Sequence, residues 1–298
     1  MAARISIGLA PMMHALPYTL SEPAALTTAA VFNSPHSGRD YPSSLKARSR
    51  LSDDELRASE DVLVDALFAA APEAGAPLLA ATAPRAWVDL NRGPGELDPA
   101  LVSGARTSGL NQRIAAGLGV IPRIVSEGAA IYNGKIPLDE AMERIRTVHT
   151  PYHAKLEDLL LRARTTFGIA LLFDCHSMPS EALRAAPRVR GQIPEIVLGD
   201  RFGASAARHV VAETQAAFEE AGFTVARNAP FAGGFITQRY GRPSRGINAI
   251  QIEIDRGLYL HPDRPEPGPA FDEIRTRLNA VIERLVTILP DRQALAAE

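Results

Sequence analysis

The stretch IALLFDCHS, residues 169–177, decides the fold that we expect of this chain. Its first five residues are an apolar run typical of a buried strand, which we predict to end at Phe173. An aspartate, a cysteine and a histidine follow. Because side chains alternate along an extended backbone, Asp174 and His176 should share one face, while Cys175 turns back into the core.

Similar segments alternate with helical ones on both sides of this stretch. Apolar runs predict further strands at residues 29–33, 87–90, 196–198 and 247–254. Apolar residues at helical spacing predict helices over residues 62–70, 138–163, 204–221 and 272–289. This order predicts an α/β fold, with a mainly parallel mixed sheet that helices cover on both faces.

Two local sequence signals indicate where one helix begins and where another is interrupted. Ser52 with Glu55 three residues later forms a capping box, in which side chains satisfy free N–H groups of the first turn, so a helix should begin directly after Ser52. Pro151 lies inside the helix predicted over residues 138–163. Since proline has no N–H to donate, it should kink or divide that helix.

The composition is that of a globular protein with a full core: of 298 residues, 46% are hydrophobic and 22% are charged. A formal net charge of −2 gives no reason to expect a nucleic-acid partner. No apolar run approaches the ~20 residues of a membrane span. The single cysteine excludes an internal disulfide and a cysteine-rich zinc site, and it fits a reducing compartment, the cytoplasm.

We expect one α/β domain over residues 25–290. A loose N-terminal arm over residues 1–24 should precede it, and a frayed tail over residues 291–298 should follow. The sequence gives no indication of the oligomeric state.

Polar residues lie at the ends of several predicted strands. They are His36, Asn91, Arg92, Asp174 and His176, and a further acid, Glu253, lies within the last predicted strand. In α/β folds, ligands bind in the crevice beyond the carboxyl ends of the strands, so these residues should converge there. Two histidines with a carboxylate can hold zinc, which makes water a usable nucleophile near neutral pH.

Each of these residues also has a structural interpretation. A single histidine after a strand is more often a loop residue bonded to backbone than a metal ligand. Glu253 could be half of a buried ion pair with Arg256, or it could be a general base. Asn91 and Arg92 could close a turn, or the arginine could bind a substrate carboxylate through two parallel hydrogen bonds.

Two other arrangements are interpreted as structural. His149 and His153 are four residues apart on one predicted helix, as in some zinc sites, but the residues between them do not fit that motif. We therefore expect both histidines to pack and to form hydrogen bonds along the helix. Ser177 lacks the G-x-S-x-G surroundings of a nucleophilic serine.

Taken together, four motifs resemble the N-formylglutamate amidohydrolase family. They are SPHSG (34–38), VDLNR (88–92), DCHSMP (174–179) and QIEI (251–254), and YHAKL (152–156), which follows Arg144, fits as well. The resemblance covers about residues 31–259 in the family's order. Because the family is similar in fold to the zinc carboxypeptidases, it implies a zinc-carboxypeptidase-like architecture.

The resemblance also implies roles. His36 and His176 would be zinc ligands, and Glu253 would be the base. Asp174 would orient one of the zinc-binding imidazoles. Arg92, with Asn91 beside it, would anchor a substrate carboxylate. The sequence does not choose a second anchor, for which the candidates are Arg85, Arg144, Arg239 and Arg245. Because Arg144 precedes the matching stretch YHAKL, we take it as a further substrate-binding candidate beside Arg92 and Asn91.

The third metal ligand is the one departure from the pattern. Carboxypeptidases place a glutamate three residues after the first histidine, where this chain has Arg39, which cannot ligate a cation. We expect the missing carboxylate to be Asp61, with Glu60 as the second choice. Asp65 would then lie on the same helical face as Asp61 and could support it.

The activity implied by the resemblance is that of an amidohydrolase with one Zn²⁺ per chain. It would cleave N-formyl-L-glutamate to formate and L-glutamate in histidine breakdown. One alternative is a deacylase or carboxypeptidase-like hydrolase of another N-acyl amino acid or peptide, because a family fixes reaction type better than substrate. The other is a non-catalytic protein that binds a small molecule on the same fold.

Overall fold

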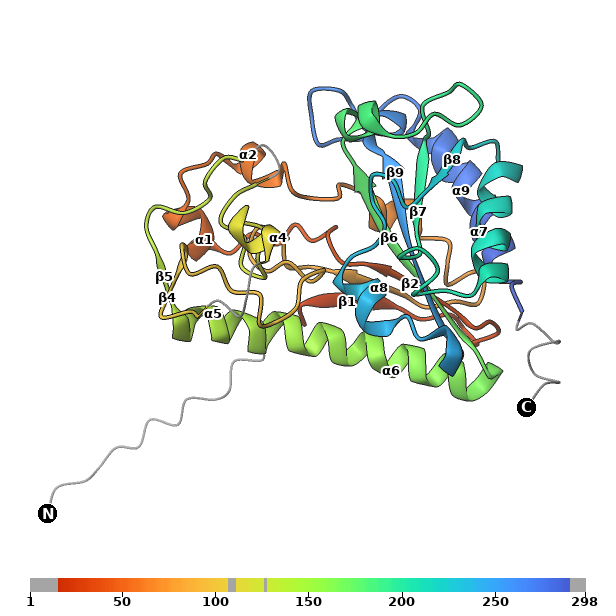
Figure 1. Ribbon diagram of the computed structural model, residues 1–298, viewed down its shortest axis with the longest axis horizontal. Helices are drawn as coiled ribbons and strands as arrows, with labels where there is room; N and C mark the ends of the chain where they lie inside the picture. Colours follow the sequence, from red (N-terminus) through yellow and green to blue (C-terminus); the bar gives the residue numbers. More distant parts are fainter. Residues whose placement is uncertain (1–15, 107–110, 126–127, 290–298) are drawn as a thin grey trace, which may run out of the picture.

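The centre of the computed structural model is a seven-stranded sheet, and the described residues are 16–106, 111–125 and 128–289 (Figure 1). In spatial order its strands are β1 (Tyr18–Ser21), β3 (Leu78–Ala81), β2 (Ala30–Ser34), β6 (Ala170–Met178), β9 (Ile247–Asp255), β7 (Ile196–Gly199) and β8 (Val225–Arg227). β1 runs antiparallel to β3 and β7 antiparallel to β9, whereas the other neighbouring strands are parallel. The sheet is thus mixed and mainly parallel, as predicted.

Helices cover both faces of this sheet, which confirms the expected α/β class. The α-helices are α1 (Ser43–Arg48), α2 (Asp53–Arg57), α3 (Val64–Leu67), α4 (Gln112–Ala115), α5 (Leu138–Arg144), α6 (Thr150–Phe167), α7 (Arg208–Glu220), α8 (Phe235–Tyr240) and α9 (Phe271–Leu285). Side chains of α3, α7 and α9 pack in the apolar core on one face, and those of α6 and α8 pack in the core on the other (Figure 1). The shorter helical turns are η1 (Ile145–His149), η2 (Ser180–Ala185), η3 (Pro243–Arg245) and η4 (Arg256–Leu258).

A second region lies beside the sheet, on the left of Figure 1. It contains α1, α2 and α4 and a two-stranded parallel sheet of β4 (Val102–Ser103) and β5 (Ile136–Pro137). Its apolar side chains belong to the same core as those of α6. This region therefore shares a core with one face of the large sheet.

Strand β6 continues beyond the point where the sequence suggested that it ends. It pairs with β9 over nine positions, from Ala170 to Met178, so Asp174 and His176 lie inside the strand. The prediction that the strand ends at Phe173 was wrong, because the hydrogen bonds to β9 hold polar residues in extended backbone. The predicted alternation is confirmed, since Phe173 and Cys175 belong to the core shared with α7 and α9.

Two other predictions also fail. Residues 87–90 are not a strand: the Trp87 N–H donates to Pro84 O (2.9 Å) and the Asp89 N–H to Val120 O (2.8 Å), so they form turns without a sheet neighbour. Part of the expected N-terminal arm is β1, which forms an edge of the sheet. Residues 1–15 and 290–298 lie outside the described residues.

The helix predicted over residues 138–163 is divided, as expected. α5 passes into the π-helical turn η1, and α6 begins at Thr150 with Pro151 in its first turn, where no N–H is needed. The capping box is confirmed as well: the Ser52 N–H donates to Glu55 Oε2 (2.7 Å) and the Glu55 N–H to Ser52 Oγ (3.3 Å). The helical pattern over residues 62–70 forms only the short helix α3.

Candidate active site

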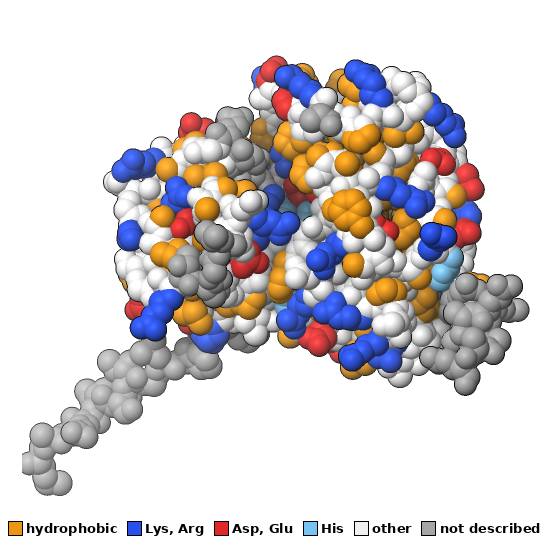
Figure 2. Space-filling model, viewed as in Figure 1, with side chains coloured by type: hydrophobic (Ala, Val, Ile, Leu, Met, Phe, Trp, Pro, Cys, Tyr) orange, Lys and Arg blue, Asp and Glu red, His pale blue; other side chains and the backbone are white. Residues whose placement is uncertain are grey.

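A cavity of about 450 Å³ opens over the polar face of β6 and β9. In Figure 2 the surface is hollowed between the two parts of the molecule, with acidic and histidine side chains at the bottom of the hollow. The residues that line the cavity include most of the sequence candidates: His36, Asp61, Asn91, Arg92, His176 and Glu253. The expected convergence of distant segments on one crevice is therefore observed.

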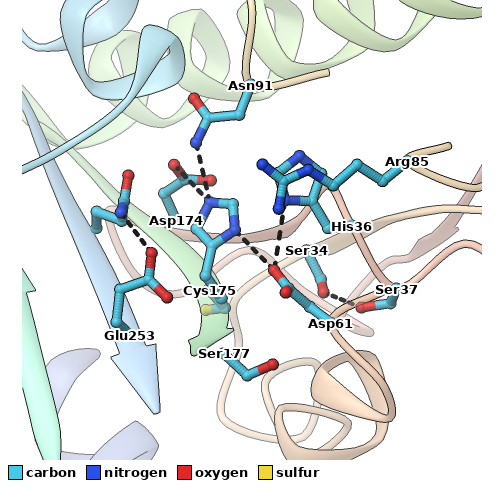
Figure 3. A network of polar contacts seen from close by, with 12 residues as sticks. Ser34, His36, Ser37, Asp61, Arg85, Asn91, Asp174, Cys175, Ser177 and Glu253 are labelled. Atoms are coloured by element: carbon cyan, nitrogen blue, oxygen red, sulfur yellow. Dashed lines mark hydrogen bonds and ion pairs between the residues drawn. The ribbon is translucent and has the colours of Figure 1, made fainter. Parts of the chain in front are cut away.

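Three buried side chains at the base of the cavity could hold a metal ion. His36, Asp61 and His176 each offer a ligand atom, and these atoms all lie within 4.8 Å of one another. Asp61 Oδ2 is 2.9 Å from His176 Nδ1 and 3.4 Å from His36 Nδ1 (Figure 3). The three residues come from the turn after β2, from the turn before α3 and from β6.

A second carboxylate lies beside the Nε2 atom of each imidazole, on the side away from Asp61. His36 Nε2 lies 2.8 Å from Asp89 Oδ1, and His176 Nε2 lies 3.1 Å from Asp174 Oδ2. When His36 donates its Nε2–H to Asp89, its Nδ1 keeps a free lone pair, and this buried atom makes no hydrogen bond. A carboxylate behind a metal-binding imidazole is the usual way in which proteins set its tautomer.

The charges of this cluster favour a cation. Burial alone would raise the pKa of Asp61, but the hydrogen bond with His176 and the nearby imidazole of His36 hold it well below its usual range. Burial would lower the pKa of His176, yet Asp174 and Asp61 raise it well above its usual value. The cluster thus stabilises positive charge on its imidazole side. A divalent cation can supply that charge, and two imidazoles with one carboxylate are a donor set that suits zinc.

The neighbouring acids do not join this cluster. Glu60, the second choice for the third ligand, accepts a hydrogen bond from Arg57 Nε (2.9 Å) and lies 3.4 Å from the hydroxyl of Tyr41. Asp65 binds Arg39 and so does not support Asp61. Of the acids considered from the sequence, Asp61 is the one that lies between the two histidines.

Glu253 faces the cluster from the neighbouring strand, because it pairs in register with His176. Gln251 Nε2 donates a hydrogen bond to Glu253 Oε1 (2.7 Å), and burial raises the pKa of Glu253 to about 8 (Figure 3). Arg256 instead binds Asp61 Oδ1 through Nη2 (2.9 Å) and donates from Nε to Ser177 Oγ (3.0 Å). Among the described residues no ion pair is formed by Glu253, so its structural interpretation as a partner of Arg256 is not supported.

Asn91 and Arg92 lie in a turn that is fixed on several sides. The Ile236 N–H donates to Asn91 Oδ1 (2.9 Å), and Asn91 Nδ2 lies 3.3 Å from His176 Nε2. A Cβ on Gly234 would come within 2.3 Å of the Asn91 amide, so only glycine fits there. Arg92 donates from Nε to Leu118 O (2.8 Å).

The two helical histidines hold this turn. His149 Nε2 lies 2.9 Å from the carbonyl oxygen of Arg92, and His153 Nε2 lies 2.9 Å from that of Leu90. The other ring nitrogen of His153 is 2.9 Å from the hydroxyl of Tyr240. Their interpretation as structural residues is confirmed, but the expectation that their hydrogen bonds run along the helix was wrong, because their partners lie in the turn 90–92 and in α8.

Arg144 lies elsewhere, which corrects its assignment as the substrate-binding candidate. Its guanidinium carbon lies 3.3 Å from the centre of the Trp87 ring, and its nitrogens bind the hydroxyl of Tyr132 (2.7 Å) and Glu140. It does not line the cavity, because these contacts hold it within the core beside α5. Of the four second-anchor candidates, only Arg85 lines the cavity.

Sequence reasoning missed several residues of the site. They are Asp89, Arg113 and Gln251, with Arg256 considered only as a partner of Glu253. Gln251 could have been found, since it lies two residues before Glu253 on the same face of one strand. Asp89 was visible in the VDLNR motif, but nothing in its spacing pointed to His36.

The fold and the site together define an α/β protein with a buried His-Asp-His cluster at the base of an arginine-lined cavity. The chain belongs to the N-formylglutamate amidohydrolase family, whose model matches residues 28–260. This confirms the resemblance found in the sequence motifs.

Named relatives agree with the family assignment. The chain is 33% identical to the N-formylglutamate deformylase of Pseudomonas aeruginosa over 241 residues, which is 79% of this chain and 84% of that protein. It is 31% identical to the Pseudomonas putida enzyme of the same name, over 75% of this chain and 78% of that protein. The crystal structure of N-formylglutamate amidohydrolase from Ralstonia eutropha JMP134 superposes with a TM-score of 0.84 and 34% identity, covering 91% of this chain and 98% of that one.

Along the described stretches of the chain, no helix combines the length and the apolar character that crossing a membrane would require.

Proposed function

We propose that this protein hydrolyses N-formyl-L-glutamate to formate and L-glutamate. The observation that carries the proposal is the placement of Glu253 beside the His36–Asp61–His176 cluster, at the base of a cavity lined by arginines. Two relatives at 31–33% identity are named for this reaction, and they support the choice of substrate. In this role the protein would take part in histidine breakdown in the cytoplasm.

The proposed cofactor is one zinc ion per chain, held by His36 Nδ1, His176 and Asp61. The free lone pair of the buried His36 Nδ1 and the acid behind each imidazole favour this assignment. When bound, zinc would lower the pKa of a water molecule and polarise the formyl carbonyl group.

The proposed task of Glu253 is proton transfer. Its carboxylate takes a proton from water as the water oxygen bonds to the formyl carbon. It then gives that proton to the amide nitrogen as the C–N bond breaks, which releases formate and the free amine. Gln251 holds one oxygen of the carboxylate in place, so the other is free to face the substrate. General-base catalysis of this kind typically contributes on the order of 10²–10⁴-fold.

The proposed task of Arg92 is to bind the substrate carboxylate nearest to the formyl group. The guanidinium is buried and its Nε and Nη1 are held by the carbonyl oxygens of Leu118 (2.8 Å) and Asn91 (2.7 Å), so it is already oriented before substrate arrives. Such preorganisation reduces the entropy lost on binding.

The experiment that tests this function is a formate-release assay on the purified protein. N-formyl-L-glutamate, N-formyl-L-aspartate and N-acetyl-L-glutamate are compared, with and without a chelator, and the metal content is measured in parallel. We expect the first substrate to be cleaved best, the chelator to abolish cleavage and one zinc to be found per chain. Preference for another acyl group would indicate a different deacylase, and binding without cleavage would indicate a non-catalytic protein.

A further inference from the structure

Four arginines line the cavity: Arg85, Arg92, Arg113 and Arg256. Two of them are neutralised by acids of the cluster. Arg85 Nε lies 3.0 Å from Asp89 Oδ2, and Arg256 Nη2 lies 2.9 Å from Asp61 Oδ1. Their charges are needed where they are, because each balances a carboxylate that supports or belongs to the histidine cluster.

Arg92 and Arg113 are in a different position. Arg92 is buried, and its one ion-pair partner among the described residues, Asp89, is 3.9 Å away and already bound by Arg85 and His36, while Glu96 offsets part of its charge from beyond ion-pair distance. Arg113 is exposed and lines the cavity, and within residues 16–106, 111–125 and 128–289 no acid forms an ion pair with it. The cavity therefore contains two guanidinium groups whose charge is incompletely balanced by the described acids.

The backbone of Arg113 is held in a fixed relation to the guanidinium of Arg92. Arg92 Nε donates to the carbonyl oxygen of Leu118, and the Leu118 N–H donates to the carbonyl oxygen of Arg113, both at 2.8 Å. A second link runs through Glu96, which accepts from the Gly93 N–H (2.7 Å) and from Asn111 Nδ2 (3.1 Å).

Asn111 in turn fixes the backbone of α4. Its side-chain oxygen accepts from the N–H groups of Arg113 (2.9 Å) and Ile114 (3.3 Å) at the start of the helix. The turn that carries Arg92 and the short helix that carries Arg113 thus form one hydrogen-bonded unit. Both arginines therefore line the same cavity, and the charge of Arg113 acts on that of Arg92.

The electrostatics of Arg92 agree with this description. Burial lowers its pKa, and Arg85 and Arg113 lower it further, against the opposing effects of Asp89 and Glu96. A buried cation whose neighbours include two other cations is under-compensated, and an anion placed between Arg92 and Arg113 would relieve it.

We propose that Arg113 binds the distal, side-chain carboxylate of the substrate, next to the carboxylate held by Arg92, and so selects N-acyl amino acids with an acidic side chain. This inference rests on the proposed function. Because Arg113 is exposed whereas Arg92 is buried, the distal carboxylate lies toward the mouth of the cavity, with the acyl group at the histidine cluster. A substrate with a neutral side chain of the same shape would offer Arg113 no carboxylate to bind.

The test compares N-formyl-L-glutamate with N-formyl-L-glutamine, which has the same shape but no distal charge. The variants are Arg113→Ala and Arg113→Lys. The control is Arg146→Ala, an exposed arginine that pairs with Glu143 outside the cavity. We expect Arg113→Ala to reduce the kcat/KM ratio of the glutamate over the glutamine substrate by about tenfold or more, as when one charged hydrogen bond is lost.

The loss should appear mainly in KM for the glutamate substrate. Arg113→Lys should restore part of the ratio, and Arg146→Ala should leave it unchanged. An equal loss on both substrates would show that Arg113 only supports the turn, and an unchanged ratio would place the distal carboxylate elsewhere; either result overturns the inference.

A binding measurement separates this inference from the proposed reaction. Isothermal titration with L-glutamate and L-glutamine needs no turnover. If the wild-type protein cleaves no formyl substrate but binds glutamate more tightly than glutamine, and loses that preference in Arg113→Ala, the proposed function fails while the carboxylate site stands. If the wild-type protein is active and Arg113→Ala keeps the full preference for glutamate, the proposed function stands while the carboxylate site at Arg113 fails.

Discussion

Each imidazole of the cluster is held between two carboxylates, and this sets the chemistry of the site at the scale of single residues. Asp61 lies between the two Nδ1 atoms, while Asp89 and Asp174 lie behind the Nε2 atoms of His36 and His176. A side chain so placed can neither rotate nor choose its tautomer freely. The candidate ligand atoms would therefore be oriented before a metal ion binds, which favours tight binding.

The adjacent acids Asp61 and Glu60 provide a matched test of the ligand set. We expect Asp61→Asn to lose zinc, because the replaced oxygen faces both imidazoles, whereas Glu60→Gln should keep it, because Glu60 is bound to Arg57. The measurement is the metal content of protein purified without added zinc. Loss of zinc in Glu60→Gln with normal zinc in Asp61→Asn would reverse the assignment.

Glu253→Gln separates catalysis from binding. The substitution keeps the size of the side chain but removes the proton acceptor, so turnover of N-formyl-L-glutamate should fall by at least ~100-fold. Zinc content and the affinity for glutamate should stay near those of the parent protein. A variant that unfolds at a much lower temperature yet turns over normally would show that Glu253 is structural, and Asp174 would be tested next.

At the scale of elements, the helical pair α5 and α6 positions the active-site turn. The π-helical turn η1 places His149 at its end, and His153 follows one turn later in α6, with the ring centres 4.2 Å apart. Both rings donate to carbonyl oxygens of the turn that carries Asn91. The long helix thus supports the turn that carries Asn91 and Arg92.

This support should make stability depend on pH. Burial lowers the pKa of His153 to about 3, from 6.5 for the exposed side chain. Below pH 6.5 the unfolded chain takes up a proton that the folded chain does not, so the free energy of unfolding should fall as the pH falls. For one histidine the slope is at most ~1.4 kcal/mol per pH unit. This loss of stability ends near the pKa of His153 in the folded protein, about 3, because below it the folded chain binds the proton as well.

Urea denaturation between pH 7.5 and pH 5 measures this slope. The wild-type protein should lose more stability over this range than His153→Gln, which has no proton to gain. Equal slopes in the two proteins would show that His153 is protonated in the folded state, contrary to the expectation.

At the scale of the whole molecule, the candidate ligands join segments that are far apart in the chain. His36 follows β2, Asp61 precedes α3, and His176 lies in β6. A bound metal ion would link all three, and its binding free energy would add to the stability of the folded chain. We expect the metal-free protein to unfold at a lower temperature, and added zinc at 100 times its Kd to contribute about 2.7 kcal/mol.

Differential scanning fluorimetry with and without zinc checks this expectation. His176→Ala, which lacks one ligand, is the control and should show no shift in Tm at the same zinc concentration. A shift of equal size in the variant would place the stabilising metal at another site.

Period-two alternation is the part of the architecture that could be predicted with least information. It placed Asp174 and His176 on one face and Cys175 on the other, because this depends only on extended backbone. The order of the strands could not be predicted, since it depends on contacts between distant segments. Arg113 was missed for the same reason: its four-residue helix has no periodicity, and its place at the cavity follows from hydrogen bonds to Leu118 and Asn111.

The arginine-lined cavity also has a consequence for how fast a substrate arrives. The whole chain carries a formal net charge of −2, so a dianion approaching from afar meets weak repulsion. Within a Debye length of the mouth, ~8 Å at physiological ionic strength, the field of Arg92 and Arg113 would attract the dianion of the proposed function. Attraction of this kind would act only at short range. Added salt should slow the capture of a doubly charged substrate more than that of a singly charged one.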